Sequence, residues 1–158
     1  MAGLFTNDPI IAQNFFLEID GAVISSLMSV SGLDIEVTVS TSKQSGSGGT
    51  QEEIKSLGAT TAAPELSLTR VAPLDSPKDK MWMWFNEIRG AGLVATDRAA
   101  KRKNGSIVLY DSSRKEVARF NFFKSWPSKI STDQLSVDST DVVKETITLQ
   151  CERLERVK

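Results

Sequence analysis

Few residues in this sequence are of the types that perform acid–base or nucleophilic chemistry. The 158 residues include no histidine, the side chain that most often serves as a general base and as a ligand of transition metals. The one cysteine, Cys151, follows Ile147 and Leu149 at alternating positions, which predicts a buried thiol on the apolar face of a strand. A catalytic thiolate would need an activating neighbour. The sequence therefore argues against zinc chemistry and against a cysteine nucleophile.

Carboxylates occur near one another, as in the two pairs described next, and such a pair can act as general acid and general base. Glu52 and Glu53 lie in a polar segment, where solvation explains them. Asp75 and Asp79 lie where a helix is expected to begin, and acidic side chains at that place bind the free amides of the first turn. Neither pair predicts a catalytic site.

Two further segments have a composition that is found in phosphate-binding or nucleic-acid-binding elements. Gly46–Gly49 is rich in glycine, but it lacks the lysine and the following helix start of a phosphate-binding loop. Surfaces that bind single-stranded nucleic acid require aromatic residues between the basic ones. Arg98 and the basic run Lys101–Lys103 have none between them, and they fit a solvated turn. We therefore expect no enzyme activity, no cofactor and no metal ion.

Length and charge are those of an ordinary globular protein. A chain of 158 residues is the size of one domain, so we expect a single domain over residues 1–158. The formal net charge of −1 gives no bulk attraction to nucleic acid or to an anionic membrane. One cysteine fits folding in a reducing cytoplasm, and neither a signal peptide nor an apolar run of ~20 residues is evident. We expect synthesis in the bacterial cytoplasm and no membrane insertion.

Strand signals begin after the first 14 residues. Phe15–Ile19 and Ala22–Val30 are expected to form a hairpin, because Asp20-Gly21 tolerates the positive φ angles of a tight turn. Leu33–Ser40 alternates apolar and polar residues throughout, which predicts a strand with one buried and one wet face.

Two segments lack this alternation. Residues 1–14 include a proline and are expected to form an irregular N-terminal arm. Residues 40–63 are rich in Ser, Gly, Thr and Gln, with only Ile54 and Leu57 as apolar anchors, which predicts a long loop within the domain. Such a loop is either an unstructured linker or a segment that becomes ordered on a neighbouring subunit, and the composition leaves both interpretations open.

One main helix is predicted. Ser76 or Asp75 can cap its first turn, and Pro77 suits the first helical position. An apolar stripe with the spacing i, i+3, i+4 and i+7 predicts the face that packs on the core. The stripe consists of Met81, Trp84, Phe85 and Ile88. Trp82 and Met83 lie off the stripe and predict cover by another element or by another subunit.

The second half of the chain returns to strands. Ile107–Tyr110 and Glu116–Lys124 are expected to pair, with Trp126-Pro127 ending the second strand and Trp126 filling the adjoining core. Val142–Leu154 alternates again, with Val143, Ile147, Leu149 and Cys151 on one face. The expected fold class is mainly β with one packed α-helix (α+β), an antiparallel β-sandwich or barrel of about eight strands.

Several blocks in order along the chain resemble one family, the tail tube proteins of contractile phages and bacterial contractile injection systems. The blocks are Phe15–Gly21 leading to Val30–Glu36, then Trp84-Phe85-Asn86, then Phe123–Ile130, and finally Val142–Leu149. The second and third blocks are the more specific, and the resemblance extends over most of the chain. It implies a structural protein that forms hexameric rings, which stack into a hollow inner tube.

The resemblance also implies partners. The tube would lie inside a contractile sheath, on a baseplate and behind a spike, and its lumen would carry an effector protein or DNA. The particle would resemble a phage tail and would be cytoplasmic, docked at a membrane or released by lysis. A monomeric β-sandwich that binds a ligand is the alternative function, because it would explain the strands and the long loop.

The residues suggest how such subunits would join. We expect Leu33–Ser40 to enter a β-barrel shared between subunits, because ring closure pairs strand edges that otherwise invite aggregation. The predicted subunit interface consists of Leu33, Ile35, Val37, Val39, Ile54 and Leu57. The opposite parity predicts side chains that face the lumen, namely Asp34, Glu36 and Thr38.

Overall fold

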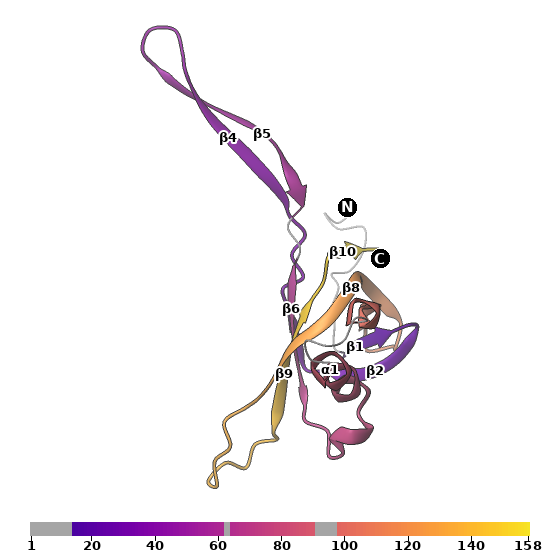
Figure 1. Ribbon diagram of the computed structural model, residues 1–158. Coiled ribbons are helices and arrows are strands. Elements are labelled where there is room, and N and C mark those ends of the chain that lie inside the picture. The colour runs from indigo at the N-terminus through magenta and orange to yellow at the C-terminus, as the bar shows by residue number, and fades with distance from the viewer. Residues whose placement is uncertain (1–13, 62–63, 91–97) are drawn as a thin grey trace, which may run out of the picture.

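The structure, a computed structural model, describes residues 14–61, 64–90 and 98–158. Antiparallel strands make up most of it, with one α-helix, as the sequence predicts (Figure 1). The predicted N-terminal arm, residues 1–14, lies outside the described residues except for Asn14. The strands are β1 (Asn14–Ile19), β2 (Ala22–Leu27), β3 (Ser29–Ser31), β4 (Val37–Ser45), β5 (Gln51–Thr61), β6 (Glu65–Val71), β7 (Lys103–Tyr110), β8 (Glu116–Thr132), β9 (Lys144–Gln150) and β10 (Arg153–Arg156). The helices are α1 (Lys80–Gly90) and the short 3₁₀ turns η1 (Ser76–Lys78) and η2 (Arg98–Lys101).

The main sheet runs in the order β2-β1-β7-β8-β9-β6-β3, with β10 paired to β8. Its first and last strands, β2 and β3, are separated along the chain by Met28 alone. The amide of Met28 donates a hydrogen bond to the carbonyl of Thr69 on β6, at 2.7 Å. The strand path therefore returns to its start in a barrel-like arrangement, which protects the edges of the body.

The predicted first hairpin is confirmed. β1 and β2 pair in antiparallel register, and Asp20 and Gly21 take φ values of 51° and 80° in the turn. The second strand is shorter than predicted, since β2 stops at Leu27 and β3 pairs with β6 instead. Gly32 then has φ 85°, and a Cβ on it would lie 2.0 Å from the carbonyl oxygen of Glu65. Only glycine fits this close approach of two backbones.

β8 is the longest strand and joins the two halves of the sheet. It pairs with β7 up to Ser125 and with β9 from Trp126 onward. The prediction that Trp126-Pro127 ends this strand is wrong. Lys124 takes φ 50°, and the register shifts between Pro127 and Lys129, so the strand turns and bulges where proline lacks its donor.

The core lies between the curved sheet and α1. Met81 and Trp84 of α1 are buried in it, and the indole Nε1 of Trp84 donates to the carbonyl of Lys101 at 2.8 Å. Phe85, which the apolar stripe placed in the core, is half-buried outside the core cluster and packs edge-on against Trp82. The described core residues are Leu17, Ile19, Leu27, Leu66, Leu68, Met81, Trp84, Ile107, Phe122, Ile147, Leu149, Cys151 and Leu154.

A buried ionic cluster attaches the start of α1 to the sheet. Arg70 on β6 is 3% exposed and binds both carboxylate oxygens of Asp79, at 2.9 and 2.7 Å. Its Nε and Nη2 also donate to Glu145 of β9, at 3.3 and 3.2 Å. Asp79 accepts from the amide of Trp82, so Asp79 caps α1. The prediction of Ser76 or Asp75 as the cap is wrong, because Asp75 makes no capping bond and precedes only η1.

Candidate assembly surface

β4 and β5 form a two-stranded sheet of their own, which we call the arm (Val37–Thr61). It projects from one end of the body (Figure 1). Two predictions are therefore wrong: the region from residue 40 to 61 is a hairpin rather than a loop, and Leu33–Ser40 is not one strand. Strand pairing orders the segment because its β-branched and small polar residues pair across the hairpin, with Gly48 and Gly49 at positive φ in the turn.

The register gives the arm two different faces. Val39 lies opposite Leu57, Thr41 opposite Lys55, and Lys43 opposite Glu53. The side chains of these pairs form the Val39 face, which is apolar near the body and carries lysines further out. The alternate positions form the Ile54 face, which consists of Ser40, Ser42, Gln44, Glu52, Ile54 and Ser56.

The apolar side chains of the arm are exposed. Val39 is 63% exposed, Leu57 is 86% exposed, and Val37 and Ile54 are also open to solvent. A two-stranded ribbon on its own is marginally stable in water, and both outer edges of this one carry backbone groups that can pair with another strand. The arm therefore has the properties of a segment that another molecule covers.

The other predicted interface and lumen residues, except Thr38, lie outside the strands of the arm. Gly32 to Glu36 have no strand structure, and Leu33 is half-buried and packs against the core of its own chain. Ile35, Asp34 and Glu36 are exposed in the same segment, whereas Thr38 lies half-buried within β4. The alternation of faces that the parity argument assumes requires a strand, and residues 32–36 form none.

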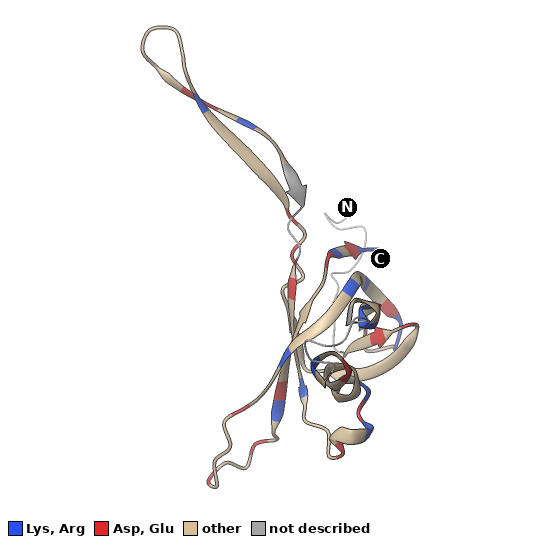
Figure 2. Cartoon of the chain, viewed as in Figure 1, with Lys and Arg blue, Asp and Glu red and all other residues tan. Residues whose placement is uncertain are grey.

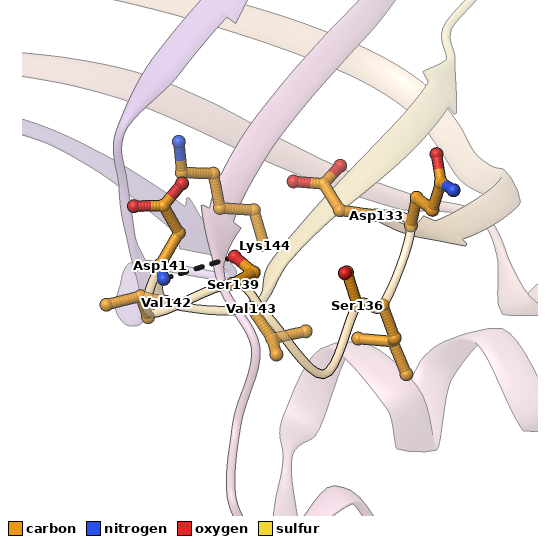
Figure 3. A pocket seen from close by; sticks show the side chains of 9 residues that line it. Asp133, Ser136, Ser139, Asp141, Val142, Val143 and Lys144 are labelled. Atoms are coloured by element: carbon orange, nitrogen blue, oxygen red, sulfur yellow. Dashed lines mark hydrogen bonds between the residues drawn. The ribbon is translucent and has the colours of Figure 1, made fainter.

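A second exposed apolar region lies on the distal loop (Asp133–Val143), which emerges at the end of the molecule opposite the arm (Figure 1). Leu135, Val137 and Val142 are exposed along it. The loop encloses a hollow of about 210 Å³ and is closed at its base by the amide of Asp133, which donates to the carbonyl of Lys144 at 3.0 Å. Figure 3 shows Asp133 and Asp141 at the two sides of this hollow. Sequence reasoning did not identify this loop, although valines and a leucine in a Ser/Asp-rich segment were a signal.

Comparison with known protein families shows to which family the chain belongs. Residues 12–155 match the family described as T4-like virus tail tube protein gp19. The chain belongs to this family. The match includes both strands of the arm and the distal loop, so the tail tube family accounts for nearly all of the chain. Among curated proteins, no match to this tail tube sequence was found.

Solved structures show that the tail tube fold is shared. A chain in the PVC sheath-tube complex of an extracellular contractile injection system, in the extended state, has 19% identity and TM-score 0.70, over 96% of this chain and 93% of that one. A chain in the tube-terminating cap of the anti-feeding prophage has 18% identity and TM-score 0.71, over 98% and 95%. Hcp1 from Flavobacterium johnsoniae has 12% identity and TM-score 0.52, over 91% and 94%.

The remaining predicted core residues of this tail tube protein, except Val143, lie in or beside the core. Ile147 and Leu149 are fully buried on β9, whereas Val143 is exposed just before it, and Glu145 takes the inward position instead. Glu145 can do so because Arg70 binds it. Ile88 and Trp126 are half-buried against the core, and Trp126 lies under the guanidinium of Arg102.

Cys151 is buried and donates from its Sγ to the carbonyl of Pro64 at 3.2 Å. Burial raises the pKa of the Cys151 thiol, which lowers its thiolate fraction and its reactivity. Among residues 14–61, 64–90 and 98–158, no group of three or more His, Cys, Asp and Glu residues is placed to hold a metal ion. No helix in the described part of this tail tube protein is long and apolar enough to span a bilayer.

Proposed function

We propose that this tail tube protein is the inner-tube subunit of a contractile injection system. Hexameric rings of the chain stack into a hollow shaft inside a contractile sheath, on a baseplate that carries a spike. The observation that carries this proposal is the family match over residues 12–155 in a chain whose arm presents exposed apolar side chains. Similar chains in a sheath-tube complex and in a baseplate described as 6-fold symmetrised support the sheath, the baseplate and the six-fold ring.

The arm is the main contact between subunits in this proposal. Its open edges offer backbone hydrogen bonds, and its exposed Val37, Val39, Ile54 and Leu57 gain apolar burial when a neighbour covers them. Ile35 at the root of the arm belongs to the same contact, and the half-buried Leu33 lies two residues before it. A tube held by strand pairing is stiff, because many backbone bonds must break together.

The role of the tube is mechanical rather than catalytic. Contraction of the sheath drives the unchanged tube through a target envelope, and the lumen carries an effector protein or DNA. Asp34 and Glu36, exposed beside the root of the arm, and Thr38 on β4 are the residues proposed to line or approach that lumen. The chain is made in the bacterial cytoplasm and is assembled into a particle that resembles a phage tail.

Negative-stain electron microscopy of the purified protein over a concentration series tests this function. Rings with a central hole, or tubes of uniform width, are the expected result. Small particles that persist at every concentration, even after sheath and baseplate proteins are added, would refute the tube and favour a monomeric β-sandwich that binds a ligand.

A further inference from the structure

The distal loop has the features of a docking surface. Val137 is fully exposed, and Leu135 and Val142 are 70% and 60% exposed. Within the loop, the amide of Asp141 donates to Ser139 Oγ at 3.2 Å (Figure 3). Exposed apolar side chains that gather at the extremity of a protein mark a surface that another molecule covers.

The distal loop is also acidic. Its carboxylates are Asp133, Asp138 and Asp141, and Figure 2 shows acidic positions along it. Among the described residues that line the hollow, Lys144 at the base carries the positive charge. In the part of the chain that the structure describes, none of these three aspartates takes part in an ion pair. The loop therefore offers apolar contact and uncompensated negative charge together, and its partner should be apolar and basic.

The Val39 face of the arm has the complementary composition. Val39 and Leu57 form an exposed cross-strand pair near the body, and Lys55 and Lys43 follow outward against the single acid Glu53. Neither lysine forms an ion pair with any described residue. The Ile54 face, by contrast, carries Glu52 and no lysine.

These two surfaces lie at opposite ends of the molecule, so they cannot meet within one chain (Figure 1). Two different surfaces on one chain that fit each other make a head-to-tail contact, which repeats along an axis. We propose that the Val39 face of one copy docks on the distal loop of the copy stacked above it. Val39 and Leu57 then cover Leu135, Val137 and Val142, while Lys43 and Lys55 approach the aspartates.

The dimensions of the arm are suitable for this contact. Nine residues of β4 extend ~30 Å at the rise of an antiparallel strand, enough to reach past the body into a neighbouring ring. The contact rests on the proposed tube function and adds to it the surface that receives each arm. It also gives the stack a direction, because an arm fits a loop and does not fit another arm.

Charge reversal tests the pairing. One variant carries Lys43→Glu with Lys55→Glu, and another carries Asp138→Lys with Asp141→Lys. Each variant alone should form rings but lose stacking, with the fraction in tubes at moderate salt falling at least ~10-fold by sedimentation and electron microscopy. Mixing the two purified variants should restore tubes, because every arm then meets a loop of opposite charge.

Glu52→Lys is the matched control, since it changes a charge on the same arm but on the Ile54 face, and it should leave stacking unchanged. Circular dichroism of each variant shows whether it folds. A measurement on the unaltered protein is independent of the variants: a carbodiimide joins lysines to carboxylates in contact. With isotope-labelled and unlabelled copies mixed before assembly, cross-links from Lys43 or Lys55 to Asp133, Asp138 or Asp141 should join labelled to unlabelled peptides.

The outcomes separate this inference from the tube function. Wild-type tubes that persist after either reversal, or variants that stack poorly and are not rescued by mixing, would overturn the docking surface and leave the tube intact. If a variant fails to fold, the cross-links of the wild-type tubes decide instead. Cross-links that join the arm to segments other than the distal loop would also overturn the docking surface. Failure of the wild-type protein to form rings or tubes at all would overturn both.

Discussion

Arg70 on β6 binds the buried carboxylate of Glu145 and the partly buried carboxylate of Asp79, and replacing it by methionine would leave both without their cation. Removal of one partner from a buried ion pair usually costs ~3–5 kcal/mol, because an uncompensated charge stays in the core. We expect Arg70→Met to lower the free energy of unfolding by that amount in urea titrations at neutral pH. Arg153→Met, at an exposed guanidinium, should change it by less than ~0.5 kcal/mol. Equal effects of the two substitutions would contradict a stabilising role for the cluster.

Asp79 makes the stability of the fold depend on pH in the acidic range. Burial by itself raises the pKa of Asp79, but the hydrogen bonds from Arg70 and from the amides of Trp82 and Met81 together lower it below its usual 3.8. Because the native carboxyl binds a proton more weakly than the unfolded one, its contribution is complete above about pH 4 and is lost as the pH falls through the native pKa. Urea titrations from about pH 6 to about pH 3 should show this decline, and Asp79→Asn should remove part of it. An unchanged slope in that variant would assign the acid sensitivity to other groups.

Gly32 is required by both its conformation and its surroundings, whereas Gly21 is required by conformation alone. Both have positive φ, but a Cβ at Gly21 would meet nothing within 4 Å, while at Gly32 it would strike the backbone of Glu65. Gly21→Ala should therefore cost only the left-handed strain, ~1–2 kcal/mol. Gly32→Ala should cost clearly more in thermal unfolding, and similar costs would show that the β3–β6 contact relaxes without penalty.

The arm is the element whose removal separates folding from assembly. Val39 and Leu57 are cross-strand partners, so replacing residues 40–56 by Asn-Gly closes a short hairpin at that pair. Because the arm forms a sheet of its own, we expect the body of this variant to keep its far-ultraviolet circular dichroism and its cooperative melting. Tubes should be absent in electron micrographs. A variant that still stacks would remove the arm from the assembly surface.

For the whole molecule, assembly should appear as added stability. Contacts made only by the folded chain raise the midpoint of thermal unfolding as protein concentration rises, by mass action. We expect the melting temperature of the full chain to increase when its concentration is raised by about 100-fold, because assembly stabilises the folded chain. The shortened-arm variant should melt at a nearly constant temperature. A constant midpoint for the full chain would contradict assembly under those conditions.

Local signals in the sequence determined several elements of this protein. The positive φ tolerated by Asp20-Gly21 placed the first turn, and the spacing of Met81 and Trp84 placed the buried face of the helix. The alternation of Ile147 and Leu149 placed a buried strand. These features depend on residues a few positions apart, so a pattern in the sequence is enough to reveal them.

Only the tertiary structure decided the features that depend on distant residues. Arg70 and Glu145 are 75 positions apart. No local pattern in the sequence shows that a glutamate on an alternating strand binds a buried arginine. The polar composition of residues 40–63 predicts a loop, yet residues 40–61 pair across a hairpin and form the arm, while residues 62 and 63 lie outside the described residues. The proposal that the distal loop receives an arm depends on its position at the opposite end of the molecule. Complementarity between two surfaces is a property of the folded shape, which no local pattern contains.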